Sequence, residues 1–249
     1  MELTGKTILI TGGGSGIGLE LTKQLSALEN TVIITGRSET KLERVKLIYG
    51  VETFVSDVTS AQNQSSLLSS ISDQYGHLDL LINNAGIMNA YDFGTDEQTV
   101  SKVQAEIDVN ATAPLLLTAR ALPLLRKGHE PAVLFVGSGV CYVAMPSTPV
   151  YTGTKALIHH AAQALRVQLK PEGIDVFEVL PPVVATDMAK ALKSGNFKLM
   201  PPSELVRQII QGLETGKHEM LVGQTRQIAL MSRLFPKFLF RQFSKVEFH

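Results

Sequence analysis

Short runs of β-branched and aliphatic residues alternate with longer amphipathic segments along most of the chain. Several of the short runs, at residues 8–10, 32–34 and 133–136, are apolar on both faces. Strands have this composition when helices cover both faces of a parallel sheet. Because β-α-β crossovers are right-handed, regular alternation gives a doubly wound open sheet. The sequence therefore predicts an α/β fold with one parallel seven-stranded sheet, helices on both faces and a single domain.

The pattern also sets approximate boundaries and shows where to search for a site. Ligands of doubly wound sheets bind at the carboxyl ends of the strands, so the loops after the strands are the places to search. We assign residues 1–225 to the domain, with a substrate lid near 185–202, and residues 226–249 to a C-terminal tail. The predicted strands are 7–10, 31–35, 53–56, 78–82, 132–136, 175–179 and 220–222, and the predicted helices are 16–28, 39–47, 63–75, 100–125, 150–169 and 202–215.

Composition excludes several classes of protein. The 23 basic and 23 acidic residues balance, so no global charge attracts nucleic acid. A single cysteine, Cys141, excludes an intramolecular disulfide and a multi-cysteine metal site, and we expect no metal. The N-terminus has no basic leader followed by a long apolar run, and no apolar stretch is long enough to span a bilayer, so we expect a cytoplasmic protein.

A glycine-rich loop follows the first predicted strand and leads directly into a helix. Glycines allow a tight turn and close approach to a pyrophosphate, whose charge is favoured at a helix N-terminus. The loop does not fit G-x-G-x-x-G, because Ile17 takes the place of the third glycine; Gly12, Gly16 and Gly18 give a different spacing. An ordinary strand-to-helix turn is the alternative, but the position after a strand favours a dinucleotide.

The end of the second strand distinguishes between the nicotinamide cofactors. An acidic residue there would bind the ribose 2′-hydroxyl, whereas an arginine accommodates a 2′-phosphate. Here Arg37 and Ser38 follow the strand, and the first carboxylate is Glu39. Although a solvated loop arginine would look the same, the pattern favours NADP(H) over NAD(H).

Tyr151 and Lys155 begin a helix-length segment at a spacing that stacks them on one helical face. An ammonium beside a phenol favours the phenolate and would move its pKa from about 10 toward neutrality. Ser138 follows the strand at 132–136 and so reaches the same sheet edge. Tyr-x-x-x-Lys alone also fits a surface pair, but this order of serine, tyrosine and lysine after a glycine loop favours acid–base chemistry.

These motifs resemble those of the short-chain dehydrogenase/reductase family over residues 3–223, which implies a Rossmann-type fold. Short stretches around Arg37, Tyr151 and Pro181 are most similar to the DltE-type bacterial oxidoreductases, although Pro182 stands where the family usually has glycine. Beyond the motifs above, the resemblance rests on segments 57–58, 83–86 and 181–186 and on Asn110.

The resemblance implies a role for each matching position. Tyr151 would be the general acid/base and Ser138 would orient the substrate carbonyl or hydroxyl. Lys155 would hold the nicotinamide ribose and lower the Tyr151 pKa, and Asn110 would fix a water that links Lys155 to solvent. The implied cofactor-binding residues are Gly12, Ser15, Gly16, Ile17, Arg37, Asp57, Val58, Asn84, Ala85, Gly86, Tyr151, Lys155, Val184 and Thr186.

The resemblance therefore implies an NADP(H)-dependent oxidoreductase that interconverts a carbonyl and a secondary alcohol. A catalytically silent NADPH-sensing regulator is the alternative, although a pure sensor would need only the cofactor loops. A nucleotide-sugar epimerase also uses Tyr-x-x-x-Lys, but such chains have an added substrate domain. Scattered Met and aromatic residues favour a small apolar substrate, and the family implies a homodimer or homotetramer.

The tail differs in character from the rest of the chain. Five of the ten Phe fall in the last fifteen residues, and residues 226–246 hold five basic residues and no acidic one. Apolar residues recur at roughly helical spacing, and Pro236 interrupts the pattern or starts a second helix. Such a segment packs against a subunit or lies on a membrane as a peripheral contact, and both interpretations stay open.

Overall fold

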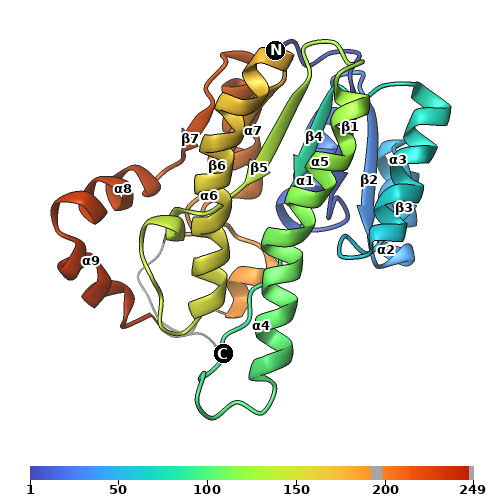
Figure 1. The fold of residues 1–249 in the computed structure, drawn as a ribbon. Helices are drawn as coiled ribbons and strands as arrows, with labels where there is room; N and C mark the ends of the chain where they lie inside the picture. Colours follow the sequence, from blue (N-terminus) through green and yellow to red (C-terminus); the bar gives the residue numbers. More distant parts are fainter. Residues whose placement is uncertain (192–197, 247–249) are drawn as a thin grey trace.

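Seven parallel strands form one sheet in the computed structural model, which describes residues 1–191 and 198–246 (Figure 1). The strand order is β3-β2-β1-β4-β5-β6-β7, so the chain winds outward from β1 in one direction and then from β4 in the other. The crevice between β1 and β4 is the point where ligands bind in such sheets. The strands are β1 (Thr7–Thr11), β2 (Thr31–Gly36), β3 (Glu52–Val55), β4 (Leu80–Asn83), β5 (Ala132–Val136), β6 (Asp175–Leu180) and β7 (Glu219–Leu221).

Helices cover both faces of the sheet, as predicted. Alternate side chains of one strand enter different cores: Ile8 and Ile10 of β1 pack with α1, α2 and α7, whereas Leu9 packs with α3, α5 and α6. This two-sided burial explains why the strands are continuously apolar. The helices are α1 (Gly16–Ser26), α2 (Glu39–Tyr49), α3 (Ala61–Tyr75), α4 (Thr99–Ile107), α5 (Ala113–Leu125), α6 (Pro149–Leu169), α7 (Pro202–Glu214), α8 (Thr225–Leu234) and α9 (Pro236–Phe243), with 3₁₀ turns at Gly139–Tyr142, Lys170–Glu172 and Asp187–Ala191.

The helix predicted over residues 100–125 contains a π turn. Helices α4 and α5 are joined without a break by the π-helical segment Asp108–Thr112. A π turn inserts one extra residue into an otherwise α-helical run and is frequent at functional sites. The other predicted helices and the seven strands are confirmed, with ends that differ by a few residues.

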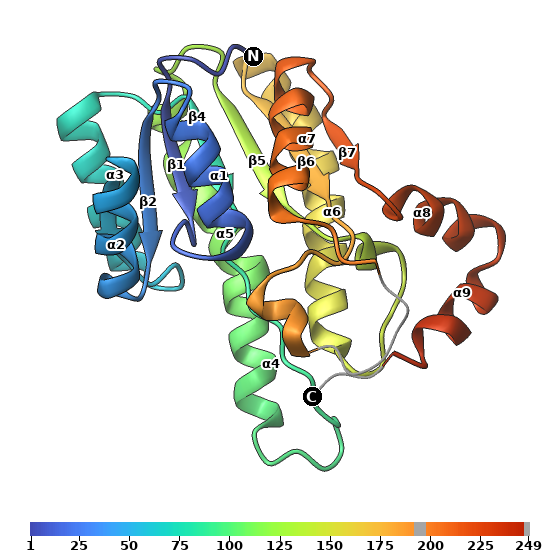
Figure 2. The same cartoon turned by 180° about the vertical axis from the view of Figure 1, so that it is seen from behind.

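The tail forms two short helices that pack against the 3₁₀ turn after β5. Pro236 starts α9, and Leu239 and Phe243 of this helix join Val143 and Met145 in a small core of their own. Figures 1 and 2 show α8 and α9 projecting from the edge of the sheet that ends in β7. Part of the predicted lid, at 192–197, and the last three tail residues lie outside the described residues. Within the described residues, no helix is long and apolar enough to cross a membrane.

The sheet core makes a prediction about stability. Phe135 of β5 is 1 % exposed, so Phe135→Ala should lower the free energy of unfolding by about 3–5 kcal/mol through lost burial and a residual cavity. Leu47→Ala removes a side chain that is 87 % exposed and should change it by less than about 0.5 kcal/mol. Urea denaturation of both variants measures the difference, and equal losses would contradict this assignment of the core.

Candidate active site

The glycine loop is shaped by close backbone contacts. Gly12 and Gly16 have φ of +68° and +53°, in the left-handed region that favours glycine. A Cβ on Gly18 would overlap the carbonyl oxygen of Gly12 and lie 2.5 Å from Nδ2 of Asn84. Each of the three glycines is therefore required by the turn, which brings the backbone of the loop and the N-terminus of α1 to the crevice.

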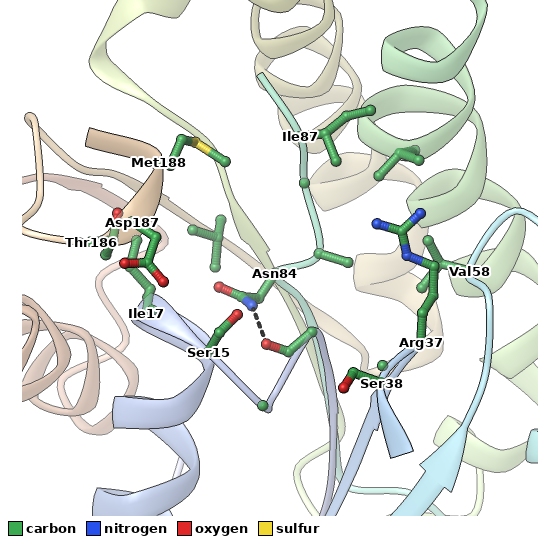
Figure 3. Close-up of a pocket in the computed structure, with 18 of the residues that line it drawn as sticks. Ser15, Ile17, Arg37, Ser38, Val58, Asn84, Ile87, Thr186, Asp187 and Met188 are labelled. Atoms are coloured by element: carbon green, nitrogen blue, oxygen red, sulfur yellow. Dashed lines mark hydrogen bonds between the residues drawn. The ribbon is translucent and has the colours of Figure 1, made fainter. Parts of the chain in front are cut away.

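Asn84 ties this loop to the end of β4. Its Nδ2 donates hydrogen bonds to the carbonyl oxygens of Thr11 at 2.9 Å and Gly12 at 3.3 Å, and Figure 3 draws the second of these. In return, the Thr11 hydroxyl oxygen accepts hydrogen bonds from the backbone N–H groups of Asn84 and Ala85, both at 3.0 Å. These bonds join the two strands on either side of the crevice.

An elongated cleft of about 420 Å³ runs along the carboxyl ends of the strands (Figure 3). Arg37 and Lys41 lie at one end, and Tyr151 and Lys155 line it as well. Glycine backbone, a helix N-terminus and cations along one open cleft fit a nicotinamide dinucleotide. The predicted cofactor residues that line the cleft are Gly12, Ser15, Gly16, Ile17, Arg37, Asp57, Val58, Asn84, Ala85, Gly86, Tyr151, Lys155 and Thr186.

The Arg37 end of the cleft holds two cations, Arg37 and Lys41, and the carboxylate of Asp57 beside Arg37 is engaged in a turn. Asp57 accepts hydrogen bonds from the backbone N–H and the hydroxyl of Thr59, at 2.9 and 2.7 Å. These bonds, with the charge of Arg37, lower the pKa of Asp57. The Ser38 side chain caps α2 by accepting a hydrogen bond from the N–H of Lys41. Lys41 was not among the predicted cofactor-binding residues, although it follows Arg37 by four residues.

Tyr151 and Ser138 meet beside the long cleft, and Tyr151 is the one of the two that lines it. Ser138 hydrogen-bonds the Tyr151 side chain and favours its phenolate, but Tyr151 is buried. Burial outweighs this bond and raises the pKa of Tyr151 to about 12, with a further contribution from the charge of Glu106. The prediction that Lys155 lowers the pKa of Tyr151 is therefore wrong for this structure, because desolvation of the phenol dominates.

Lys155 is a buried lysine that interacts with groups on two strands, β5 and β6. Its Nζ lies 5.7 Å from the centre of the Tyr151 ring and donates a hydrogen bond to the carbonyl oxygen of Val136 at 3.0 Å. Desolvation lowers the pKa of Lys155 to about 8, against the opposing charge of Glu178. Glu178 is fully buried in β6, and its Oε2 lies 2.7 Å from Nδ1 of His159 on α6.

The Glu178–His159 pair was not predicted. The bond to Glu178 raises the pKa of His159, which favours an imidazolium beside the carboxylate. Glu178 Oε1 has no hydrogen-bond partner in the described part of the chain, which leaves its charge to act on Lys155. A charged residue inside the apolar run of β6 is the signal that could have identified it, since buried charges are rare unless paired.

Asn110 lies in the π turn, behind the cleft. Its Oδ1 accepts from the N–H of Ile87 and its Nδ2 donates to the carbonyl oxygen of the same residue, both at 2.8 Å. A Cβ on Gly86 would lie 3.3 Å from Oδ1 of Asn110 and 3.8 Å from Nζ of Lys155. The structure thus brings Asn110 and Lys155 together and uses the Asn110 amide to hold the loop after β4.

Glu106 precedes Asn110 by one turn and was also missed. It is fully buried on α4, and its Oε1 accepts from the N–H of Asn89 at 2.6 Å and from the backbone of Tyr151. Tyr151 is in the first turn of α6, where the N-cap residue Thr148 makes no side-chain cap. The Glu106 carboxylate therefore lies against the first turn of α6, where the backbone of Tyr151 favours its charged form.

A second pocket of about 140 Å³ opens on the other side of Tyr151. Ser138 and Val184 lie here rather than in the long cleft, together with Tyr151. Most of the lining is apolar, and the tail contributes to it. The apolar residues that line the pocket include Met88, Val140, Met145, Pro181, Pro182, Ile228, Phe243 and Val246.

The sequence is similar to those of known proteins over most of its length. The family model described as short chain dehydrogenase matches residues 6–196. The chain belongs to the short-chain dehydrogenase family. It is 37 % identical over 226 residues to the uncharacterized oxidoreductase DltE of Bacillus subtilis, covering 88 % of this chain and 89 % of the relative, and 28 % identical over 224 residues to an uncharacterized oxidoreductase of Staphylococcus saprophyticus, covering 88 % and 95 %.

Solved structures of short-chain dehydrogenases share the fold across nearly the whole chain. One from Burkholderia cenocepacia, in complex with NADP, has a TM-score of 0.85 at 24 % identity and covers 98 % of this chain and 99 % of its own. One from Streptomyces avermitilis has a TM-score of 0.83 at 21 % identity and covers 98 % and 97 %. The protein is thus an NAD(P)-dependent short-chain dehydrogenase of the DltE type with a Rossmann fold.

The buried carboxylate near Lys155 makes a prediction about proton affinity. Without the charge of Glu178 the Lys155 ammonium loses its support, so Glu178→Gln should lower the pKa of Lys155 below about 8. Glu219→Gln is the control, since Glu219 lies on the neighbouring strand β7 and accepts a hydrogen bond from the Tyr142 hydroxyl. A pH titration of the Cε shifts in ¹³C-lysine-labelled protein measures both variants. An unchanged Lys155 pKa in folded Glu178→Gln would contradict this role.

Proposed function

We propose that the protein is an NADP(H)-dependent oxidoreductase that interconverts a carbonyl and a secondary alcohol. The observation that carries the proposal is the position of Tyr151, which lines both the long cleft and the apolar pocket. A group at this boundary can reach a cofactor on one side and a substrate on the other. Geometry comes before proton affinity in identifying a general acid or base.

In the reducing direction, the Tyr151 hydroxyl donates a proton to the substrate oxygen. Ser138, which hydrogen-bonds Tyr151, orients that oxygen from the pocket side. When bound, the nicotinamide supplies or accepts the hydride. In the oxidising direction, Tyr151 takes the proton from the alcohol, and its hydrogen bond with Ser138 favours the phenolate.

Lys155 has the role of placing a positive charge beside the reacting groups. Its Nζ lies on the Tyr151 side of α6 and lines the cleft where the nicotinamide ribose would bind. With a pKa of about 8, the Lys155 ammonium exchanges protons near neutral pH. We propose that a water at Asn110 links this ammonium to solvent, supported by the approach of both side chains to Gly86.

The preference for NADP(H) over NAD(H) rests on the basic end of the cleft. Arg37 and Lys41 are exposed there, and the carboxylate of Asp57 is turned to Thr59. Two cations without a competing ribose-binding carboxylate at the end of β2 favour a 2′-phosphate. Thr186 and Val184 would hold the carboxamide at the opposite end, where the chain passes from the cleft to the pocket.

The size and lining of the pocket favour a small apolar carbonyl or alcohol. We also propose that the protein is cytoplasmic and assembles as a homodimer or homotetramer through α4, α5 and α6. Exposed apolar side chains on these helices support the assembly, because burial against another copy would remove them from water. They are Val100, Ile107, Leu116, Leu157 and Val167.

Removal of the Tyr151 hydroxyl tests catalysis. Tyr151→Phe should lower turnover of a carbonyl substrate by about 10²–10⁴-fold, because it removes the proton donor, while NADPH affinity stays within about threefold. Tyr75→Phe, at the far end of α3, is the matched control. NADPH absorbance across a panel of ketones and aldehydes measures turnover. Unchanged turnover in Tyr151→Phe would sink the proposed mechanism, and unchanged cellular function would favour the NADPH-sensing alternative.

Removal of the Arg37 guanidinium tests cofactor preference. Arg37→Ala should weaken NADPH binding roughly 10- to 100-fold through the loss of a charge-assisted contact with the 2′-phosphate, and NADH binding by less than about twofold. Arg207→Ala changes an exposed arginine on α7 and serves as the control. Calorimetric titration gives both affinities. An equal loss for the two cofactors would contradict recognition of the phosphate.

A further inference from the structure

Helices α8 and α9 expose a surface that we call the tail face. It combines five large apolar side chains, each about half or more exposed, with five exposed cations. Within the described residues, no ion pair joins these cations to a carboxylate. The apolar members are Leu230 (57 %), Leu234 (59 %), Phe235 (57 %), Phe238 (53 %) and Phe240 (48 %), and the basic members are Arg226, Arg233, Lys237, Arg241 and Lys245.

The tail face is not needed to attach the two helices to the domain. Their opposite side already does so, since Leu239 and Phe243 are buried against Val143 and Met145. The Ser147 hydroxyl also donates a hydrogen bond to the carbonyl oxygen of Val246 at 3.0 Å. The five exposed apolar side chains are therefore additional to the core, and they fall within residues 230–240. Large apolar side chains gathered on one exposed segment are typical of an interaction site.

Charge distinguishes the tail face from the rest of the chain. Residues 226–246 hold five basic residues and no acidic one, whereas the whole chain has 23 of each. The domain without its tail is consequently acidic. An anionic surface attracts the tail and repels the body, which would orient the protein with α8 and α9 toward that surface.

We propose that the tail face binds an anionic lipid surface. Phe and Leu interleaved with Arg and Lys on short amphipathic helices are suited to the boundary of headgroups and acyl chains, where the rings are buried and the cations meet lipid phosphates. A second copy is less suited, because a symmetric contact through the same face would oppose like charges with no carboxylate between them.

The position of the tail face allows such contact. Both views show α8 and α9 standing out from the domain beyond β7 (Figures 1 and 2). Their inner side reaches the apolar pocket through Ile228, Phe243 and Val246. The lipid-facing and pocket-facing sides therefore belong to the same pair of helices.

Flotation of the full-length protein with lipid vesicles tests the proposal. Wild type should bind vesicles of phosphatidylglycerol and phosphatidylcholine, bind phosphatidylcholine vesicles at least about tenfold less, and be released by 0.5 M NaCl, roughly the range in which surface charges are screened. Phe235→Ala with Phe238→Ala, and separately Lys237→Glu with Arg241→Glu, should each lower binding about tenfold or more. Leu47→Ala with Ile48→Ala, on the exposed side of α2, should not.

Folding and assembly are measured on the same variants. Circular dichroism and NADPH binding should match wild type, because none of the substituted residues lines the cleft or the pocket. Failure to bind anionic vesicles would overturn the proposal, as would equal binding to neutral ones. If vesicle binding is absent and the tail variants instead change the sedimenting mass, the tail face is an interface between copies. None of these outcomes depends on turnover, so they are distinct from failure of the proposed activity.

Discussion

Lys155 places an ammonium group in the interior, and the two neighbouring strands β5 and β6 supply the groups that stabilise its charge. Desolvation of an ammonium costs several kcal/mol, so a buried lysine needs hydrogen-bond acceptors and an opposite charge nearby. The carbonyl oxygen of Val136 accepts from it directly, and Glu178 on the next strand supplies the charge. Because β5 and β6 pair in register at Phe135 and Glu178, strand pairing itself fixes where the carboxylate lies.

Three polar side chains hold the backbone around the site in place. Glu106 fixes the first turn of α6, Asn110 holds the loop after β4, and Asn84 joins that loop to the glycine turn. Each makes hydrogen bonds to backbone groups of a neighbouring segment. The positions of Tyr151 and Lys155 are therefore set in part by the backbone that these polar side chains hold in place.

Much of the fold and part of the site could be predicted from local sequence. Strands apolar on both faces, a glycine loop after β1 and Tyr151 one helical turn before Lys155 are short-range patterns, and the structure has each of them. The proton affinity of Tyr151 could not be predicted, because it depends on burial by distant segments. Glu106 was missed because a glutamate on a helix gives no sign in the sequence of whether it faces water or a neighbouring segment. Glu178 stands in the apolar run of β6, which marks it as buried, but its partner His159 comes from α6 and could not be predicted from that run.

The π turn between α4 and α5 constrains how this part of the chain can vary in length. One extra residue rotates everything after it by about 100° relative to a plain α-helix. Glu106 can face Asn89 while Leu117, farther along, faces the sheet core, because the turn takes up this rotation. A one-residue deletion between 108 and 112 would turn one of these faces away from its partner. In an alignment of relatives, gaps should therefore fall in the loop before α4 and not within this helix.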